Sequence, residues 1–410
     1  MKILMIDKYY FIKGGAERCF FELKQLLESR GHKVVPFSMK HPKNFPSKYT
    51  PYFVENIDFN PSSFIQKVYT GIQSIERIIY SKQAQDRIRK LIRKTKPDIA
   101  HLHMIDHQIS PSILSVLKNE GIPVVQTVHT YKPICPNYRL YNERRGEICE
   151  KCINGSYYHA ILTRCHKNSY FASMLVALEM YIHRSLKLYQ RFIDLFIVPS
   201  QFIADKMINA GFDKKKIFLV YHFLNLKEYS YSKKNGNYFL YFGRLSQEKG
   251  LITLLKAMKK VKGSFLKIVG DGPMRPVLEN YVQNNKLKNV EFLGSLDGEP
   301  LKEIISESSF VVVPSEWYEN SPMVIYESFA IGKPVIGSRI GGIPEFIDHG
   351  QNGYLFEPSN DQELGYWINY LIKRKNLCVA MGKAARKKAL NLFNENLHYH
   401  QIMDLYHSLQ

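Results

Sequence analysis

Short apolar runs alternate with helical patterns along almost the whole chain, and this alternation restricts the fold more than any other feature. In the first half the apolar runs fall at residues 2–7, 33–39, 97–103, 123–129, 195–200 and 217–222. The segments between them, such as residues 15–30, place apolar side chains at the spacing of one helix face. Strands that alternate with helices predict a parallel sheet covered on both faces.

A second series of the same kind follows residues 225–237, which are poor in apolar side chains and are interpreted as a linker. Its strands are expected at residues 238–243, 265–270, 290–294, 310–314, 334–337 and 353–357. The predicted fold class is therefore α/β, with two doubly wound Rossmann-like domains facing each other across a cleft. We expect one domain over residues 1–225, with a Cys-rich insert at about 133–168, and a second over 237–390. Residues 391–410 are expected to form a helix that packs back on the N-terminal domain.

Two cations flank the turn after the strand at residues 238–243. Arg244 ends the strand, and Lys249 directly precedes a helical pattern. Arginine grips phosphate oxygens with two parallel hydrogen bonds, lysine acts as a point charge, and a helix start attracts anions. The pair suits a diphosphate, although a solvated basic turn would look the same in the sequence.

A second cluster follows the strand at residues 310–314. The helix start at residues 321–324 offers free backbone N–H groups to an anion. Glu319 precedes this helix and Glu327 lies within it, and carboxylates accept hydrogen bonds from sugar hydroxyls. The alternative, two ordinary surface charges, is less favoured beside Arg244 and Lys249 in one domain.

These motifs together resemble family 4 glycosyltransferases of the GT-B type. The resemblance is carried by the Glu319–Glu327 spacing with its intervening Asn-Ser-Pro-Met-Val, and by the Gly-Arg-Leu that begins at Gly243 and leads to Gly250. The Gly-Gly-Ala-Glu-Arg that begins at Gly14 is also similar. The similarity extends from residue 1 to about residue 390.

The resemblance implies a role for each matching residue. Arg244 and Lys249 match the pair that holds the donor diphosphate, Glu327 the carboxylate that binds the nucleotide ribose, and Glu319 the carboxylate near the donor sugar. The backbone that contacts sugar and phosphate corresponds to Asn320, Ser321, Pro322, Met323 and Val324.

The N-terminal half contributes three further positions by the same resemblance. Gly14 and Gly15 open a helix after the first strand, in the loop that lies across the cleft from the diphosphate in this family. His129 ends the strand at residues 123–129 and matches the histidine beside the donor sugar. From the residues alone, the glycines would fit a plain tight turn, and the histidine an ordinary polar loop position.

The expected activity is retaining transfer of a hexose-type sugar from a UDP- or GDP-sugar, without a catalytic metal or cofactor. The resemblance makes a cell-surface polysaccharide or a lipid-linked oligosaccharide the expected acceptor, bound by the N-terminal domain. A non-catalytic protein that binds sugar nucleotides or polyanions is the alternative. A nucleotide-sugar epimerase leaves the cations and carboxylates above unexplained. No nucleic-acid partner is expected, since no known reader motif is present.

Four cysteines crowd into a short stretch directly after His129. Cys135, Cys149, Cys152 and Cys165 have a Cys-x2-Cys centre and suit a tetrahedral structural zinc site. Free thiols, or an iron–sulfur or redox centre, are the alternatives.

The positive charge is concentrated in the first half of the chain. Residues 1–236 hold 37 Lys and Arg against 19 Asp and Glu, whereas residues 237–410 hold 20 against 18. Such a surface attracts anionic lipids or phosphorylated acceptors. The basic amphipathic segment at residues 66–95 is the expected contact with an anionic membrane. Residues 169–192 are also apolar, but Glu179, His183 and Arg184 favour a packed helix there.

The first residues resemble a strand rather than a signal peptide, so we expect a cytoplasmic protein, peripheral on the inner face of the cell membrane.

Overall fold

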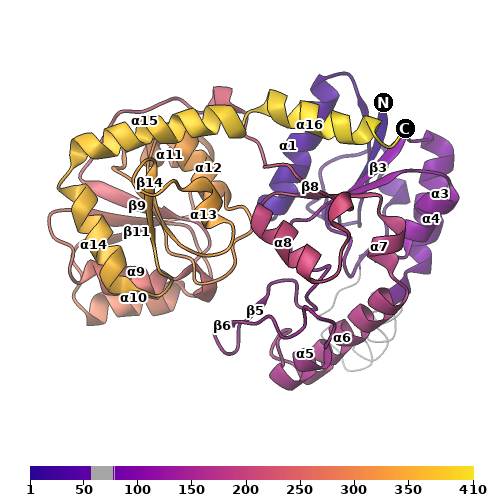
Figure 1. Cartoon of the computed structure of the whole chain (residues 1–410), viewed down its shortest axis with the longest axis horizontal. Helices are drawn as coiled ribbons and strands as arrows, with labels where there is room; N and C mark the ends of the chain where they lie inside the picture. The colour runs from indigo at the N-terminus through magenta and orange to yellow at the C-terminus, as the bar shows by residue number, and fades with distance from the viewer. Residues whose placement is uncertain (57–76, 78) are drawn as a thin grey trace. The chain divides into compact units, whose positions relative to one another are not determined.

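A computed structural model describes residues 1–56, 77 and 79–410, which divide into two compact units (Figure 1). Unit 1 comprises Met1–Arg144, Cys149–Val220 and Tyr399–Gln410. Unit 2 comprises Arg145–Ile148 and Tyr221–His398. Each unit is built around one six-stranded parallel sheet, so the predicted pair of Rossmann-like α/β domains is confirmed.

The sheet of unit 1 has the strand order β2-β1-β3-β4-β7-β8. Its strands are β1 (Lys2–Ile6), β2 (Lys33–Phe37), β3 (Ile99–Leu102), β4 (Val124–Thr127), β7 (Leu195–Val198) and β8 (Ile217–Leu219). The helices around it are α1 (Gly15–Ser29), α3 (Lys82–Thr95), α4 (Ile113–Asn119), α7 (Leu188–Phe192) and α8 (Gln201–Asn209). Four consecutive residues of β1, Ile3 to Ile6, are fully buried, because helices cover both faces of a parallel sheet.

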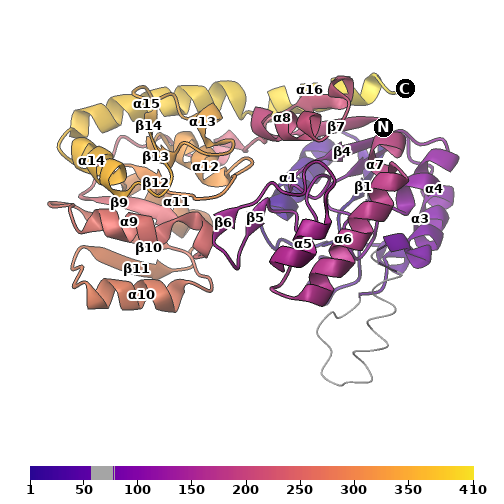
Figure 2. The same ribbon diagram turned by 60° about the horizontal axis from the view of Figure 1, so that its bottom comes forward.

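The Cys-rich insert of unit 1 has some regular structure that the sequence did not predict. It contains the short strand β5 (Tyr141–Asn142) and the helix α5 (Tyr158–Thr163), which packs against α6 (Tyr170–Ser185); the strand β6 (Glu147–Ile148) belongs to unit 2. Figure 2 shows α5 and α6 side by side at the edge of the unit. The predicted long helix over residues 169–192 is broken between α6 and α7, where Lys187 adopts a left-handed backbone.

The sheet of unit 2 has the order β11-β10-β9-β12-β13-β14. Its strands are β9 (Tyr238–Phe242), β10 (Phe265–Val269), β11 (Val290–Gly294), β12 (Val311–Val313), β13 (Val335–Ser338) and β14 (Gly353–Phe356). Its helices are α9 (Leu251–Met258), α10 (Arg275–Asn284), α11 (Gly298–Glu307), α12 (Met323–Ile331), α13 (Ile343–Phe346), α14 (Asp361–Ile372) and α15 (Lys375–Leu392). The strand bounds of both units agree with the predicted runs to within three residues.

Side chains of β9 alternate between the two faces of this sheet, as a strand requires. Leu240 and Phe242 pack with α12 and α15, whereas Phe239 and Tyr241 pack with α9 and α14. Each face therefore has its own apolar core, and the sheet is held from both sides.

The strand orders create one switch point in each sheet, where the chain leaves the first strand and later returns on its other side. In unit 1 this point lies between β1 and β3, and in unit 2 between β9 and β12. Ligands of doubly wound folds bind beyond the carboxyl ends of the strands at such points. The loops after β1, β3, β9 and β12 are therefore the places to look for a site.

The helix expected over residues 391–410 begins at Glu395 in the structure. The helix α15 ends at Leu392, and α16 (Glu395–His407) follows after Phe393 and Asn394. The backbone of Leu224 bonds to Phe393 at this break. Residues from Tyr399 onward belong to unit 1, where Tyr406 is fully buried.

The segment at residues 66–95, predicted to be one or two basic helices, is described only in its second part. Residues 66–76 and 78 lie outside the described residues. The remainder contains α3, whose apolar side chains Ala84, Ile88, Leu91 and Ile92 are all buried in unit 1. The apolar face of α3 therefore belongs to the core and is not free to contact a membrane.

A buried ion pair fixes α6 to unit 1. Lys132, which follows β4, lies 2.7 Å from a carboxylate oxygen of Glu179 on α6, and both side chains are almost wholly buried. His107 and His183 face the same carboxylate at 4.0 and 3.9 Å. Burying a charge away from water is costly, and the attraction between the two partners offsets this cost. Removal of one partner therefore leaves the other as an uncompensated buried charge.

We predict that Glu179→Gln lowers the free energy of unfolding by about 3 kcal/mol, because Lys132 is then buried without its counter-charge. Urea denaturation followed by circular dichroism measures the change. The matched control is Glu28→Gln, which removes a solvent-exposed partner of Lys24 on α1. This control should be close to wild type. Equal unfolding curves for Glu179→Gln and wild type would show that the buried pair does not hold α6.

Candidate functional site

The loop after β9 carries the two predicted phosphate-binding cations of unit 2. Arg244 is exposed, and within the part of the chain that the structure describes its guanidinium forms no ion pair. Lys249 ends a short 3-10 turn (Gln247–Lys249) just before α9. Its ammonium group lies 2.5 Å from a carboxylate oxygen of Glu319, in the loop after β12. The two loops at the switch point of this sheet are thus joined by a salt bridge.

Glycine at position 250 allows this joining of the loops. Gly250 has φ +68° at the start of α9, a conformation that side chains with a Cβ rarely adopt. A Cβ placed there would lie 1.9 Å from the carbonyl oxygen of Pro314, at the end of β12. Only glycine permits so close an approach between the start of α9 and the loop after β12.

Glu319 is buried beneath the loop rather than exposed to solvent. It accepts hydrogen bonds from Lys249 and from the Ser315 hydroxyl, the latter at 2.7 Å. Burial alone would raise the pKa of this carboxyl, but the positive charge of Lys249 and these hydrogen bonds hold the pKa below its usual value. Glu319 is therefore ionised at neutral pH and keeps the Lys249 ammonium in place.

The predicted anion-binding turn leads into α12, which begins at Met323 with Pro322 as its N-cap. Asn320 and Ser321 are partly exposed just before it, and Met323 and Val324 are partly exposed in its first turn. The Ser321 hydroxyl lies 2.7 Å from that of Tyr326. The first turn of a helix leaves backbone N–H groups without intrahelical partners, so this segment offers donors beside Lys249 and Glu319.

Glu327 lies on α12, with 7% of its surface exposed. It accepts a hydrogen bond from the Tyr229 hydroxyl at 3.3 Å. Unit 2 therefore gathers Arg244, Lys249, Glu319 and the start of α12 at one switch point, with Glu327 further along the same helix.

The remaining predicted residues lie in unit 1. Gly15 is the first residue of α1, and Gly14 is its N-cap with an extended backbone. A Cβ on Gly14 would make only an ordinary contact, and one on Gly15 would meet nothing within 4 Å. The local packing does not demand glycine at either position.

His129 lies beyond the end of β4 and contacts a second histidine that sequence reasoning missed. The Nε2 atom of His129 is 2.8 Å from Nδ1 of His103, which follows β3, and the two rings stack at 5.0 Å. Burial lowers the pKa of His129 to about 4, so its ring is neutral at pH 7. A neutral imidazole has one donor and one acceptor nitrogen, and the bond to His103 determines which is which.

His103 is itself positioned by its neighbours. Its ring stacks on His101 at 4.7 Å, and Phe20 of α1 meets it edge-on at 5.1 Å. His101 is hydrogen-bonded to Tyr406 of α16 and to Thr127 of β4. The His-x-His pattern at the end of β3 was the sequence signal for this stack, because residues i and i+2 of a strand face the same side.

A pocket lies beside this stack, lined by residues from the ends of β3 and β4. Asp106 and Lys132 are among its lining residues. Asp106 pairs with Lys8, beyond the end of β1, at 2.7 Å. Although burial opposes ionisation, Lys8 holds the pKa of Asp106 far below its usual value. The carboxyl edge of the unit 1 sheet is thus polar and charged.

The four clustered cysteines are all free thiols in the insert. The Asn137 side chain bonds to the Cys135 thiol at 3.0 Å and to the Cys165 carbonyl at 3.2 Å, and Cys152 shares a small apolar cluster with Cys165. Burial, with the other three cysteines nearby, raises the pKa of the Cys152 thiol. Among the described residues, no group of three or more His, Cys, Asp or Glu side chains is arranged to hold a metal ion. The zinc site therefore stays a prediction.

Comparison with protein families identifies the class of protein that this fold and these loops define. Residues 13–228 match the model described as glycosyltransferase family 4, and residues 225–388 match that of glycosyl transferases group 1. The first match alone covers more than half of the chain. The chain belongs to glycosyltransferase family 4.

Individual relatives agree with this assignment. An uncharacterized glycosyltransferase of Methanocaldococcus jannaschii is 26% identical, over 83% of this chain and 91% of the relative. The N-acetyl-alpha-D-glucosaminyl L-malate synthase of Bacillus anthracis is 24% identical, over 100% of this chain and 98% of the relative. Among solved structures, Anabaena HepE in complex with UDP and glucose matches with a TM-score of 0.69 and 20% identity, covering 100% of both chains.

We predict that the protein loses stability as the pH falls from about 6.5 to about 4. Burial lowers the pKa of His107, His129 and His183 to about 4 in the folded chain, whereas an unfolded histidine titrates near 6.5. Between these values the unfolded chain binds more protons, so unfolding becomes easier as the pH falls. Each histidine should contribute about 1 kcal/mol per pH unit in this window.

Urea denaturation at a series of pH values measures this slope. His107→Asn removes one of the three groups and should flatten it, and asparagine tolerates the left-handed backbone at this position. His400→Gln, at an exposed position of α16, serves as the control and should retain the full slope. A wild-type stability that does not change between pH 4 and 6.5 would contradict the prediction.

Proposed function

We propose that this glycosyltransferase moves a hexose from a UDP- or GDP-sugar, with retention of anomeric configuration and without a catalytic metal. The observation that carries the proposal is the Lys249–Glu319 salt bridge, which fixes a cation beside the free amides of the α12 N-terminus. A diphosphate needs such an arrangement, since its charge is spread over several oxygens. The relative HepE, solved with UDP and glucose, supports the same donor class.

In the proposed reaction, the bond between the anomeric carbon and the diphosphate oxygen breaks as the acceptor hydroxyl attacks from the same face. The proton of the acceptor hydroxyl passes to the departing diphosphate, and no protein nucleophile takes part. Arg244 and Lys249 stabilise the negative charge that develops on the leaving group, where fixed cations are most effective. Glu319 and the segment from Asn320 to Val324 hold the sugar and phosphates, and Glu327 holds the ribose.

The acceptor is assigned to unit 1. Gly14 and Gly15 leave space at the start of α1, and His129 presents a neutral imidazole held by His103. Most of the positive charge of the chain lies in residues 1–236, which favours an acidic or phosphate-bearing acceptor. A growing cell-surface polysaccharide or a lipid-linked oligosaccharide satisfies this requirement.

Calorimetric titration with UDP, GDP, dTDP and ADP tests the donor site. We predict that UDP or GDP binds at micromolar affinity and that Arg244→Ala weakens this binding by about tenfold or more, because a charge-assisted phosphate contact is lost. The matched control is Arg374→Ala in unit 2, whose guanidinium stacks on Tyr370. Its affinity should equal that of wild type. If no nucleotide binds, or if both variants behave alike, the proposed donor site is wrong.

We also propose that Cys135, Cys149, Cys152 and Cys165 bind a structural zinc ion. Four thiolates are a donor set that zinc prefers, and the Cys-x2-Cys centre is typical of such sites. Three of the four cysteines lie near one another, because Asn137 bonds to the Cys135 thiol and the Cys165 carbonyl, and Cys152 shares an apolar cluster with Cys165. Zinc would add stability to an insert with little regular structure of its own.

Metal analysis of protein purified without chelator should find about one zinc per chain. Cys149→Ser with Cys152→Ser should abolish it, whereas the control Cys19→Ala, in α1, should retain it. Zinc near zero in the wild type, with four titratable thiols in the insert, would leave free thiols as the correct interpretation.

A further inference from the structure

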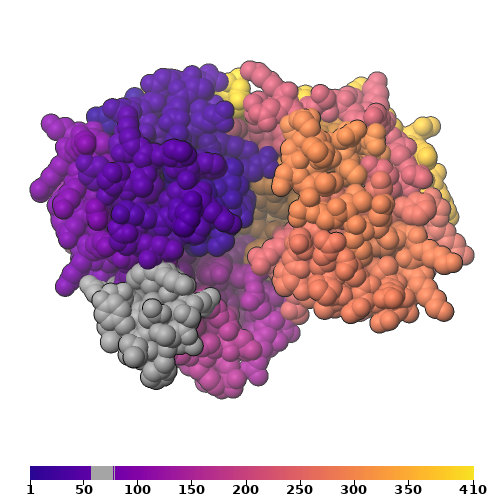
Figure 3. Space-filling model, turned by 180° about the vertical axis from the view of Figure 1, so that it is seen from behind, coloured from indigo at the N-terminus to yellow at the C-terminus, as the bar shows by residue number. Residues whose placement is uncertain are grey.

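The outer surface of α5 and α6 is apolar, although it faces solvent. Eight of the eighteen exposed large hydrophobic side chains in the described part of the chain fall within residues 158–186. Scattered exposed hydrophobic side chains are normal, but so dense a patch marks an interaction site. Six of them, Tyr158, Leu162, Phe171, Met174, Leu178 and Tyr181, are between 42% and 63% exposed. Figure 3 shows this magenta region on the surface of the molecule.

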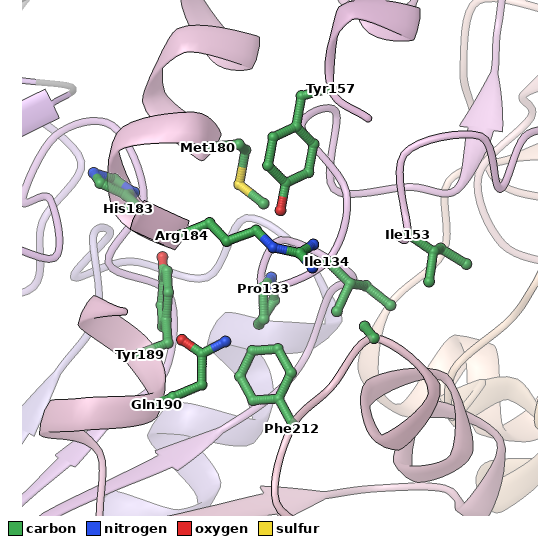
Figure 4. A pocket seen from close by; sticks show the side chains of 11 residues that line it. Pro133, Ile134, Ile153, Tyr157, Met180, His183, Arg184, Tyr189, Gln190 and Phe212 are labelled. Carbon is green, nitrogen blue, oxygen red and sulfur yellow. The ribbon is translucent and has the colours of Figure 1, made fainter. Parts of the chain in front are cut away.

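The patch is not the spare edge of a buried helix, because the other face of α6 is already packed. Ser173, Val176, Ala177 and Met180 are buried. Figure 4 shows Met180 and Arg184 directed into a pocket of unit 1 that is also lined by His183, Tyr157 and Phe212. The helix is thus apolar on both faces, and only one face is covered within the unit.

The outer residues of α6 follow a helical spacing of their own. Phe171, Met174, Leu178 and Tyr181 succeed one another by three or four positions and so form one stripe. Tyr158 and Leu162 on α5 extend this stripe sideways, because α5 packs against α6. We call these six residues, with the cations described below, the α5–α6 surface.

The charges around the stripe are of one sign. Residues 151–192 contain six Lys and Arg and a single acidic residue, Glu179, which is fully buried in its pair with Lys132. Lys167 and Lys187 are exposed at the two ends of α6. Arg164 lies 3.8 Å over the ring of Tyr170 at the start of the helix. Thus no carboxylate is exposed within this stretch of the described chain.

We propose that the α5–α6 surface docks on an anionic lipid bilayer. Exposed aromatic and aliphatic side chains enter the boundary between headgroups and acyl chains, while cations around them pair with anionic headgroups. A helix of 16 residues is about 24 Å long and lies in the plane of the interface. No described helix combines the length and hydropathy needed to cross a bilayer.

A second copy of the chain is a less favourable occupant. A two-fold interface through this surface would bring the same cations on both copies together without an opposing carboxylate. That repulsion would oppose association. The membrane proposal thus uses both properties of the surface, the apolar stripe and the surrounding positive charge, and it does not depend on the donor or acceptor assigned above.

Co-sedimentation with lipid vesicles tests the proposal directly. The full chain should sediment with vesicles of equimolar phosphatidylcholine and phosphatidylglycerol at low ionic strength, and much less with phosphatidylcholine alone or at about 0.5 M salt. Phe171→Ser with Leu178→Ser should weaken binding by about tenfold or more. Lys167→Ala with Lys187→Ala should weaken it by about twenty-five-fold, at about fivefold for each cation.

The matched control is Tyr366→Ser with Leu390→Ser, which removes two exposed apolar side chains of unit 2 and should bind vesicles like wild type. Thermal melts verify that each variant is folded. If the variant that removes Phe171 and Leu178 does not fold, the lysine variant provides the test. Wild type that does not sediment with anionic vesicles, or equal binding by all variants, overturns the proposal. A second result would also overturn it: wild type does not bind vesicles, and sedimentation velocity shows a dimer that Phe171→Ser with Leu178→Ser dissociates.

Discussion

The salt bridge between Lys249 and Glu319 is the interaction on which the candidate donor site depends. It joins the loop after β9 to the loop after β12, the two loops at the switch point of the unit 2 sheet. The approach is possible only because Gly250 has no side chain to collide with Pro314. The position of the Lys249 ammonium is therefore set by the fold before any ligand arrives. A ligand that binds there therefore loses less of its binding free energy to ordering the site.

The same ion pair gives the two cations different characters. The Lys249 ammonium is partly neutralised by a buried carboxylate, whereas Arg244 is exposed and extends from the end of the strand. In the proposed reaction, a diphosphate at Lys249 also lies near Glu319, whose negative charge opposes its binding. Negative charge that develops on the leaving group would strengthen its interaction with both cations.

Much of the fold could be predicted from the sequence, because buried parallel strands appear as short apolar runs whatever their tertiary partners. The motif residues of unit 2 could be grouped for a similar reason, since the carboxyl ends of neighbouring strands meet at one edge. The contact between His103 and His129 was missed because the two residues are 26 positions apart in the sequence. They lie beyond the ends of β3 and β4, and only the fold shows that these two strands are neighbours. The membrane contact predicted for residues 66–95 stays a prediction, because residues 66–76 and 78 lie outside the described residues. In the described part of that segment, the apolar face of α3 is in the core.

The helix α6 shows why the burial of individual side chains, rather than composition, identifies a surface that can contact a membrane. The sequence predicts a packed helix from Glu179, His183 and Arg184; Glu179 and His183 are buried, whereas Arg184 is exposed. The buried pair with Lys132 holds the carboxylate of Glu179 inward. The exposed side chains of α6 are mainly apolar, among them Phe171, Met174 and Leu178, together with Arg184 and Ser185. An internal charge pair near the pocket of His129 therefore determines which face of α6 meets the surroundings, and it links the polar interior of unit 1 to its apolar surface.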